Sequence, residues 1–234
     1  MSLPIFYEQD ITTATSMFEL SELTAKHAFQ VLRLQAKDQI ALTDGRGYLH
    51  TCVILSATKK TGTVNIINSS FTEAPTQNIV LAVSLLKNQS RIEWLIEKAT
   101  EIGIQKIIPL ICERTEKQHF KIERFKQIIV SAMLQSKQTW LPELSLPVSS
   151  KTFFYSKTLP GLKIIAHCNT GSKKHIHELA KPDAFTIAIG PEGDFTLNET
   201  QLAIENDFEP VHLGSNRLRT ETAALTSIIC LAKL

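Results

Sequence analysis

The chain carries two glycine-containing segments near its carboxyl end, IGPEGDF at residues 189–195 and LGSNRLRTET at residues 213–222. Each segment follows a short apolar run and precedes a pattern typical of a helix. Glycine is favoured where the backbone has to turn sharply or approach another group closely. In an open α/β sheet, loops at the same ends of neighbouring strands enclose a ligand crevice. The two segments therefore predict a binding site built from loops.

Upstream of these segments, apolar runs alternate with stretches of helical periodicity. Ser90 and Glu93 match a capping box, Gly103 is expected to stop that helix, and Thr196 with Glu199 forms a second capping box. Strands that alternate with helices favour an α/β fold with a parallel sheet. The expected strands are 79–86, 106–112, 163–168, 185–190 and 211–214, and the expected helices are 90–102, 122–132, 196–205 and 221–232.

The amino-terminal region reads as β-rich, which predicts a small barrel or sandwich. The expected strands are 39–43, 48–55 and 63–67, with turns at Asp44–Gly45 and Lys59–Gly62. One helix is expected from Glu22 to Leu32, with Ala25, Ala28, Phe29 and Leu32 on its apolar face. The polar stretch 69–78 contains a proline and is typical of a linker. We therefore expect two domains, residues 1–72 and residues 73–234.

Composition narrows the class of protein. Hydrophobic residues make up 43% of the chain and charged residues 21%, which is typical of a folded globular protein and excludes disorder. The net charge of +2 produces no global basic field, so binding to RNA would need a local basic patch. The four widely spaced cysteines form no CxxC pair and are expected to fill the core. Without a signal-peptide pattern or a long apolar span, we expect the cytoplasm.

Several common catalytic motifs are absent from the sequence. It has no phosphate-binding P-loop, no dinucleotide fingerprint and no nucleophile elbow, so a nicotinamide oxidoreductase is disfavoured. His175 and His177 have the spacing of a strand pair, but no third ligand lies nearby in the sequence. A solvated histidine pair is therefore favoured over a metal site, and no metal is expected.

The two glycine segments offer different chemistry. The loop at 190–193 presents backbone N–H and C=O groups that suit a neutral heterocycle such as adenine, although a plain strand-to-helix turn has the same pattern. In the second loop, Glu221 is a good first-turn residue because a helix amino terminus favours negative charge. Arg217 and Arg219 have no such explanation, and arginine suits planar or phosphate-like anions. They are predicted to contact a ligand or substrate.

Basic side chains also follow the first two strands expected in the second domain. Arg91 and Arg114 come after these strands, so a parallel sheet would place them at the same edge as the two loops. Side chains of this kind suit RNA phosphates and base edges. Each of them taken alone is more typical of a solvated surface residue than of an RNA contact.

At these residues the chain resembles a known family over nearly its whole length. It is similar to the bacterial methyltransferases that modify N3 of one uridine in small-subunit (16S) ribosomal RNA, members of the SPOUT superfamily of knotted enzymes. Five segments carry the resemblance, at residues 27–34, 91–103, 109–115, 189–195 and 213–222. Asn216 and Arg217 depart from the family pattern, which expects a basic and an aliphatic residue there.

The resemblance implies an architecture and a set of partners. It implies an amino-terminal PUA-like β-barrel that grips ribosomal RNA, and a carboxyl-terminal α/β domain that holds S-adenosylmethionine. The last segment of that domain is expected to thread a trefoil knot, a feature that general rules on chain threading would not predict. A homodimer is also expected.

The hypothesis assigns roles to individual residues. Arg219 is expected to stabilise negative charge on a uracil carbonyl, and Glu221 either orients Arg219 or accepts the proton from N3. The expected cofactor-binding residues are Ile189, Gly190, Glu192, Gly193, Leu213, Gly214, Leu218 and Thr220. The expected RNA contacts are His27, Arg33, Arg91 and Arg114.

Two alternatives remain open. The first is another SPOUT enzyme that methylates a ribose 2′-oxygen or guanine N1, which mapping of the modified nucleoside would distinguish. The second is a noncatalytic RNA-binding module with the same fold, which would not bind S-adenosylmethionine.

Overall fold

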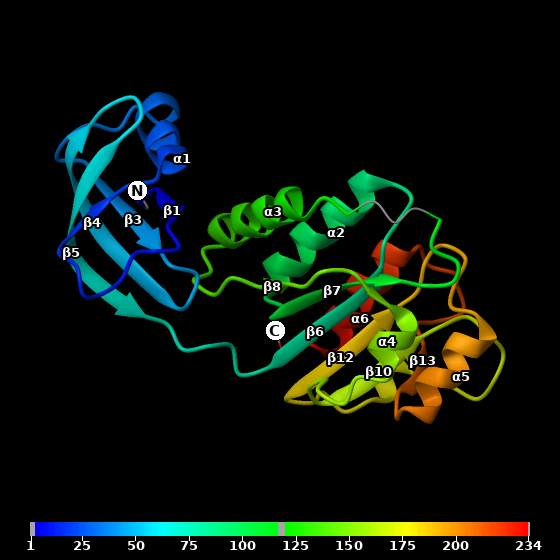
Figure 1. Cartoon of the computed structure of the whole chain (residues 1–234). Coiled ribbons are helices and arrows are strands. Elements are labelled where there is room, and N and C mark those ends of the chain that lie inside the picture. The colour runs from blue at the N-terminus through cyan, green and yellow to red at the C-terminus, as the bar shows by residue number, and fades with distance from the viewer. Residues whose placement is uncertain (1–2, 117–119, 234) are drawn as a thin grey trace. The chain divides into compact units, whose positions relative to one another are not determined.

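The structure is a computed structural model that describes residues 3–116 and 120–233. The chain divides into two compact units (Figure 1). The first unit contains Met1–Ala74 and Met133–Leu141, and the second contains Pro75–Ala132 and Pro142–Leu234. In the described part of the chain, no helix is long and apolar enough to cross a membrane.

The first unit is built on a five-stranded sheet in the order β1-β3-β4-β5-β2. Strands β1 and β3 are parallel, and the other pairs are antiparallel. Both predicted hairpins are present, since β3 turns into β4 and β4 turns into β5. The strands are β1 (Ile5–Tyr7), β2 (Met17–Glu19), β3 (Gln39–Thr43), β4 (Tyr48–Ala57) and β5 (Gly62–Phe71).

The single α-helix expected over 22–32 was wrong in its second half. Helix α1 (Glu22–Ala25) continues as the wider π-helix η1 (Lys26–Val31), in which the Leu32 amide donates to the His27 carbonyl at 3.0 Å. Ala25 and Ala28 are buried as predicted, but Leu32 is 44% exposed. The extra residue in a π-helical turn moves Leu32 away from the face that an α-helix would have buried.

The second unit contains an all-parallel sheet, as predicted from the alternation of strands and helices. Its strand order is β11-β13-β10-β12-β6-β7-β8, and β9 also pairs with β7. The strands are β6 (Asn78–Ser84), β7 (Lys106–Ile111), β8 (Glu143–Leu144), β9 (Val148–Ser149), β10 (Leu162–Ala166), β11 (Lys174–His175), β12 (Ala184–Ile189) and β13 (Glu209–His212).

Helices cover both faces of this sheet. One face packs against α4 and α5 through a core that includes Val80, Ala82, Phe154 and Phe208. On the other face, α6 packs against β6, β12 and α2 (Figure 1). The helices are α2 (Gln89–Ile102), α3 (Ile122–Gln135), α4 (Ser150–Phe154), α5 (Leu197–Glu205) and α6 (Thr220–Leu231), together with the 3₁₀ turn η2 (Ile176–Glu178).

The helix ends test the sequence signals directly. Gly103 ends α2 with a φ of 94°, and Thr196 with Glu199 forms the reciprocal capping box of α5, both as predicted. Ser90 is not the cap of α2, because Asn88 caps the helix and its side chain accepts from the Ser90 amide at 2.9 Å. The side-chain carbonyl of Asn is as good a cap as a hydroxyl, and here it caps the helix two residues earlier than predicted.

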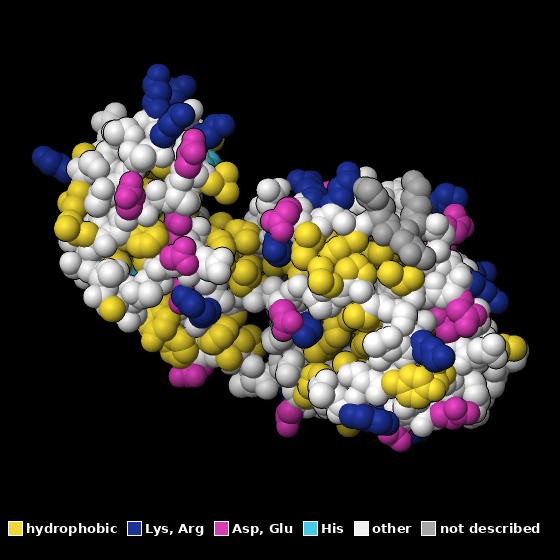
Figure 2. Space-filling view, in the orientation of Figure 1, with side chains coloured by type: hydrophobic (Ala, Val, Ile, Leu, Met, Phe, Trp, Pro, Cys, Tyr) yellow, Lys and Arg dark blue, Asp and Glu magenta, His cyan; other side chains and the backbone are white. Residues whose placement is uncertain are grey.

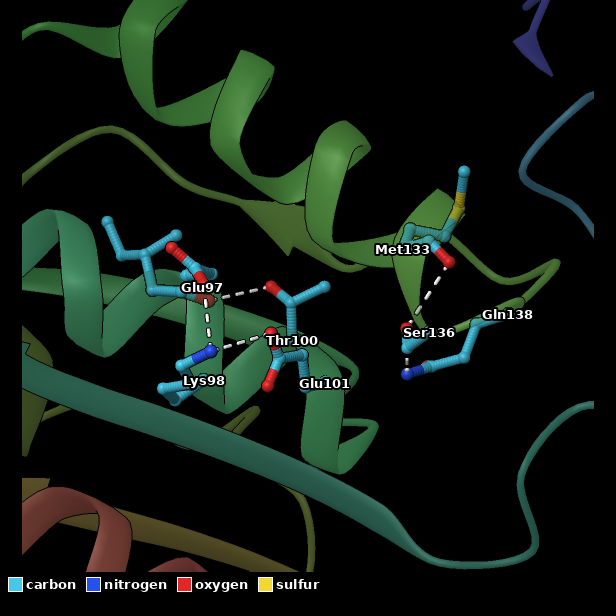
Figure 3. A network of polar contacts seen from close by, with 8 residues as sticks. Glu97, Lys98, Thr100, Glu101, Met133, Ser136 and Gln138 are labelled. Atoms are coloured by element: carbon cyan, nitrogen blue, oxygen red, sulfur yellow. Dashed lines mark hydrogen bonds and ion pairs between the residues drawn. The ribbon is translucent and has the colours of Figure 1, made fainter. Parts of the chain in front are cut away.

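Local polar contacts hold the surface of α2 and the segment that follows α3. The Lys98 ammonium contacts Glu97 at 2.8 Å and Glu101 at 2.9 Å (Figure 3). In the first unit, the Gln138 amide donates to the Ser136 hydroxyl at 2.9 Å (Figure 3). Exposed ion pairs of this kind contribute about 0.3–0.5 kcal/mol each, so they tune the helix surface rather than determine the fold.

Candidate active site

A cavity of about 440 Å³ lies at the carboxyl ends of three neighbouring strands, β10, β12 and β13. Its walls come from the loops that follow these strands, at 167–173, 190–196 and 213–219. Strands β13, β10 and β12 are adjacent in the sheet, so their three loops meet at one edge. This is the position at which open parallel sheets bind their ligands.

Most residues that the sequence assigned to a cofactor line this cavity. They are Ile189, Gly190, Glu192, Leu213, Gly214, Leu218 and Thr220. Gly193 does not line it, and its carbonyl instead accepts a hydrogen bond from the Arg114 guanidinium at 2.7 Å. Gly214 has a φ of 125° and open space where a Cβ would point, so its backbone faces the cavity without a side chain in the way.

Hydrogen bonds join the loop after β12 to the loop after β13. The Thr220 hydroxyl donates to the Gly190 carbonyl at 3.0 Å, and both residues are buried. The Arg217 guanidinium donates to the Glu192 carbonyl at 3.2 Å, while the Glu192 carboxylate accepts from the Lys87 amide at 3.2 Å. These contacts place the two glycine segments side by side, as their common position after parallel strands suggested.

Asp194 connects the third loop to the same wall. It has a positive φ of 66°, and its carboxylate accepts from the Cys168 amide at 2.7 Å and from the Phe195 amide at 2.8 Å. A short carboxylate side chain tolerates this backbone conformation because it bonds to neighbouring amides. Asp194 therefore ties the loop after β10 to the loop after β12.

The two residues assigned to catalysis occupy different surroundings. Arg219 lines the cavity and is exposed, at the N-cap position of α6. Glu221 does not line the cavity; it is 7% exposed and lies 3.6 Å from the Arg91 guanidinium. The sequence had expected Glu221 near Arg219 and Arg91 on RNA, whereas the structure brings Glu221 and Arg91 together.

The residues assigned to RNA lie in both units. His27 and Arg33 are exposed in the first unit, where His27 packs edge-on against Phe6 and Arg33 follows η1 with a φ of 59°. Figure 2 shows Lys and Arg side chains gathered near α1 in this unit. Arg91 and Arg114 belong to the second unit, where Arg91 lies in the first turn of α2 and Arg114 lies in the loop after β7.

The loop after β10 contributes to the cavity, although its residues carry no motif that predicted this. His167, Cys168 and Lys173 line the cavity, yet the sequence had singled out only the two glycine loops. Cys168 is exposed, so the expectation that all four cysteines fill the core was wrong for this residue. The strand before this loop, β10, was predicted at 163–168. The expected parallel sheet was the one feature of the sequence analysis that could have placed the loop after β10 beside the two glycine loops.

The electrostatics of the cavity centre on His167. Burial lowers the pKa of its imidazole, the Lys173 ammonium lowers it further, and the Asp194 carboxylate partly offsets both effects. The ring is therefore neutral at neutral pH. Among the side chains of residues 3–116 and 120–233, no group of three or more His, Cys, Asp or Glu is arranged to hold a metal ion.

Comparison with known proteins supplies a second line of observation. Residues 72–232 match the family model of an RNA methyltransferase domain, and residues 23–67 match that of an RNA methyltransferase PUA domain. Ribosomal RNA small subunit methyltransferase E of Synechocystis sp. is 31% identical over 205 residues, covering 85% of this chain and 67% of that protein. The protein of the same name from Aquifex aeolicus is 27% identical over 232 residues, covering 96% of each chain.

Solved structures agree with these matches. The ribosomal RNA small subunit methyltransferase E of Neisseria gonorrhoeae, bound to S-adenosylmethionine, superimposes with a TM-score of 0.86 at 28% identity and covers 98% of this chain and 97% of its own. A Legionella pneumophila protein that also holds S-adenosylmethionine superimposes with a TM-score of 0.90 at 29% identity, covering 99% of this chain and 97% of its own.

Proposed function

The chain belongs to the RNA methyltransferase family, and on that basis we propose that it transfers a methyl group from S-adenosylmethionine to N3 of one uridine in small-subunit ribosomal RNA. The relatives are named as small-subunit ribosomal RNA methyltransferases, and two similar structures hold S-adenosylmethionine. The observation that supports the proposal most directly is the cavity formed by the three loops, with Arg219 on its wall.

The cavity residues fit S-adenosylmethionine. A volume of about 440 Å³ falls in the range of small-molecule sites, and the glycine loops offer backbone donors and acceptors without side chains in the way. We assign the cofactor to the loops after β12 and β13, held by Ile189, Gly190, Glu192, Leu213, Gly214, Leu218 and Thr220. Gly193 supports this site from outside through its bond to Arg114. When bound, the cofactor supplies a methyl group already activated by the sulfonium.

Arg219 is proposed as the catalytic residue that touches the substrate. When N3 gives up its imide proton to solvent water, negative charge spreads onto the neighbouring uracil carbonyls, and a guanidinium held near them stabilises that charge. Glu221 is proposed to position the wall of the site through Arg91 rather than to accept the proton, because it is buried and does not line the cavity. Correct orientation of N3 and the methyl group supplies the remaining acceleration.

The finer architecture belongs to the same proposal. A trefoil knot is favoured because β13 pairs with β10, whereas the following helix α6 packs on β6 and β12 and is bonded to Gly190. The chain must therefore cross beside the loop after β12. We propose residues 1–72 as a PUA-like β-barrel, residues 73–234 as the knotted methyltransferase domain, a homodimeric assembly, and action on ribosomal RNA in the cytoplasm.

His27, Arg33 and Arg114 are proposed to contact RNA. The first two are exposed on the segment that follows α1, and Arg114 is exposed on the loop after β7. Such contacts to phosphates release counterions, so RNA binding should weaken with salt far more than cofactor binding does.

The deciding experiment maps modified nucleosides. Small-subunit RNA from cells that lack this protein should lack one N3-methyluridine, and the purified protein with S-adenosylmethionine should restore it. Restoration of a ribose 2′-O-methyl group or of N1-methylguanine would instead select the other SPOUT activity. If calorimetry detects no binding of S-adenosylmethionine, the noncatalytic RNA-binding module is the better reading.

A variant tests the role of Arg219. Arg219→Ala should bind the cofactor normally but lower turnover by about 10²–10³-fold, the usual effect of removing one charge-stabilising donor. The matched control is Arg124→Ala, which removes an exposed guanidinium that pairs with Glu93 and does not line the cavity. Full activity of Arg219→Ala would remove this residue from the mechanism.

A further inference from the structure

His167 stands out among the cavity residues because its side chain is buried and unsatisfied. The residue is 8% exposed and follows directly after β10. Within the described residues, neither of its ring nitrogens has a hydrogen-bond partner. Its backbone is fully engaged, since the amide donates to the Val211 carbonyl at 3.4 Å and the carbonyl accepts from Lys173 at 2.9 Å.

Such a side chain needs an explanation. Buried polar atoms in native proteins are almost always hydrogen-bonded, and an orphaned nitrogen costs free energy that an apolar side chain would not. The backbone bonds fix the position of the residue on the cavity wall. Both ring nitrogens are covered in the free protein, so a molecule bound in the cavity reaches one of them when the ring turns toward it.

The neighbouring charges narrow the kind of group that His167 can meet. A neutral imidazole presents one donor and one acceptor. The Lys173 ammonium lies nearby but is already bonded to the carbonyls of His167 and Asn169, at 2.9 and 2.7 Å. A hydroxyl both donates and accepts, so it matches either tautomer of a neutral ring. The cationic groups of the cofactor are better matched by the carboxylates of Glu192 and Asp194, which line the same cavity.

We propose that His167 is a cofactor-contacting residue whose ring nitrogen hydrogen-bonds to a ribose hydroxyl of S-adenosylmethionine. This inference rests on the proposed function, since it assigns a further contact within the same cavity. It also explains why the loop after β10 carries a buried histidine at a position that packing alone would fill with an apolar residue.

The test combines protein variants with ligands that differ by one hydroxyl. The variants are His167→Phe, which keeps the ring but removes both nitrogens, and His167→Asn, which keeps one donor and one acceptor. His177→Phe is the matched control, because His177 is exposed and does not line the cavity. The probes are S-adenosylhomocysteine, 5′-methylthioadenosine and the 2′-deoxy and 3′-deoxy forms of 5′-methylthioadenosine. Calorimetry on the full chain measures each affinity.

The expected affinities form a thermodynamic cycle that combines the substitution of His167 with the removal of a ribose hydroxyl. His167→Phe should weaken S-adenosylhomocysteine and 5′-methylthioadenosine by the same factor, about 5- to 50-fold, the effect of one lost hydrogen bond to a buried group. Removing one of the two ribose hydroxyls should cost affinity in the wild type but not in His167→Phe, since contacting groups are energetically coupled. His167→Asn should retain most of the affinity. The ligand-free His167→Phe protein should melt no lower than the wild type.

Several outcomes would overturn the inference. Unchanged affinity in His167→Phe, weakening of S-adenosylhomocysteine alone, or a lower melting temperature of the ligand-free variant would each do so. If no variant folds, equal affinity of the wild type for the ribose and both deoxyribose probes has the same effect. These results leave the proposed function intact as long as the wild type binds S-adenosylhomocysteine, whereas failure of the wild type to bind it would end both.

Discussion

The hydrogen bond from Thr220 to Gly190 is the contact that joins the two glycine loops most directly, so its removal is the sharpest test of how the cavity is built. Thr220 begins α6, and its hydroxyl reaches the Gly190 carbonyl at 3.0 Å. The side chain is only 5% exposed, and Gly190 is buried as well. Thr220→Val replaces the hydroxyl by a methyl group of nearly the same size and leaves the carbonyl without this donor.

The magnitude follows from that one bond. Because valine fills the same volume, there is no cavity to add, and the cost is that of an unsatisfied buried carbonyl, about 1–3 kcal/mol. For a chain of this size, each kcal/mol lowers the melting temperature by about 2–4 °C. We also expect S-adenosylhomocysteine to bind more weakly, since the bond holds together two loops that line its proposed site.

Urea unfolding of the ligand-free protein measures the free energy of unfolding, and calorimetry measures the affinity for S-adenosylhomocysteine. Thr220→Ser is the matched control, because it keeps the hydroxyl while removing a methyl group. The serine variant should retain the hydrogen bond and bind ligand nearly as the wild type does. If Thr220→Val proves as stable as the wild type, the hydrogen bond from Thr220 does not join the two loops.

Three further predictions concern other buried or reactive groups. Cys168 should be the thiol that iodoacetamide alkylates first, because it is exposed on the cavity wall, whereas burial raises the pKa of Cys52 to about 11 and of Cys112 to about 12. Bound S-adenosylhomocysteine should protect Cys168 from alkylation. Mass mapping that finds no protection would count against the assigned site. Burial lowers the pKa of His50 from 6.5, so the unfolded chain binds a proton that the folded chain does not. The free energy of unfolding should therefore fall as the pH drops below about 6.5, by at most about 1.4 kcal/mol per pH unit. Urea unfolding at several pH values should show a weaker dependence of this free energy on pH in His50→Leu. Glu199→Gln should lower the free energy of unfolding by about 1.5–3 kcal/mol, because the buried carboxylate accepts three hydrogen bonds and an amide cannot keep all of them, and a loss below about 0.5 kcal/mol would contradict that account.

Several features of the fold were readable from the sequence because they depend on neighbours along the chain. The capping box of Thr196 and Glu199 and the left-handed residue Gly103 involve contacts within a few positions, so the residue types alone predict them. The alternation of apolar runs and helical periodicity likewise predicts a parallel sheet. Local signals failed where two of them compete. Asn88 displaced Ser90 as the cap of α2, and a π-helical turn carried Leu32 out of the core.

The residues of the site likewise include some that local sequence predicts and some that depend on tertiary structure. Its two glycine loops could be found from sequence because a sharp turn after a buried strand demands glycine, and because arginine before a helix has no local explanation. The pairing of Glu221 with Arg91 and the presence of His167 on the cavity wall could not be found in this way. The first depends on the packing of α6 against α2, and the second depends on the order of strands in the sheet, which places β10 between β13 and β12. That order is set by packing between residues far apart in the chain, and no spacing within a single segment encodes it.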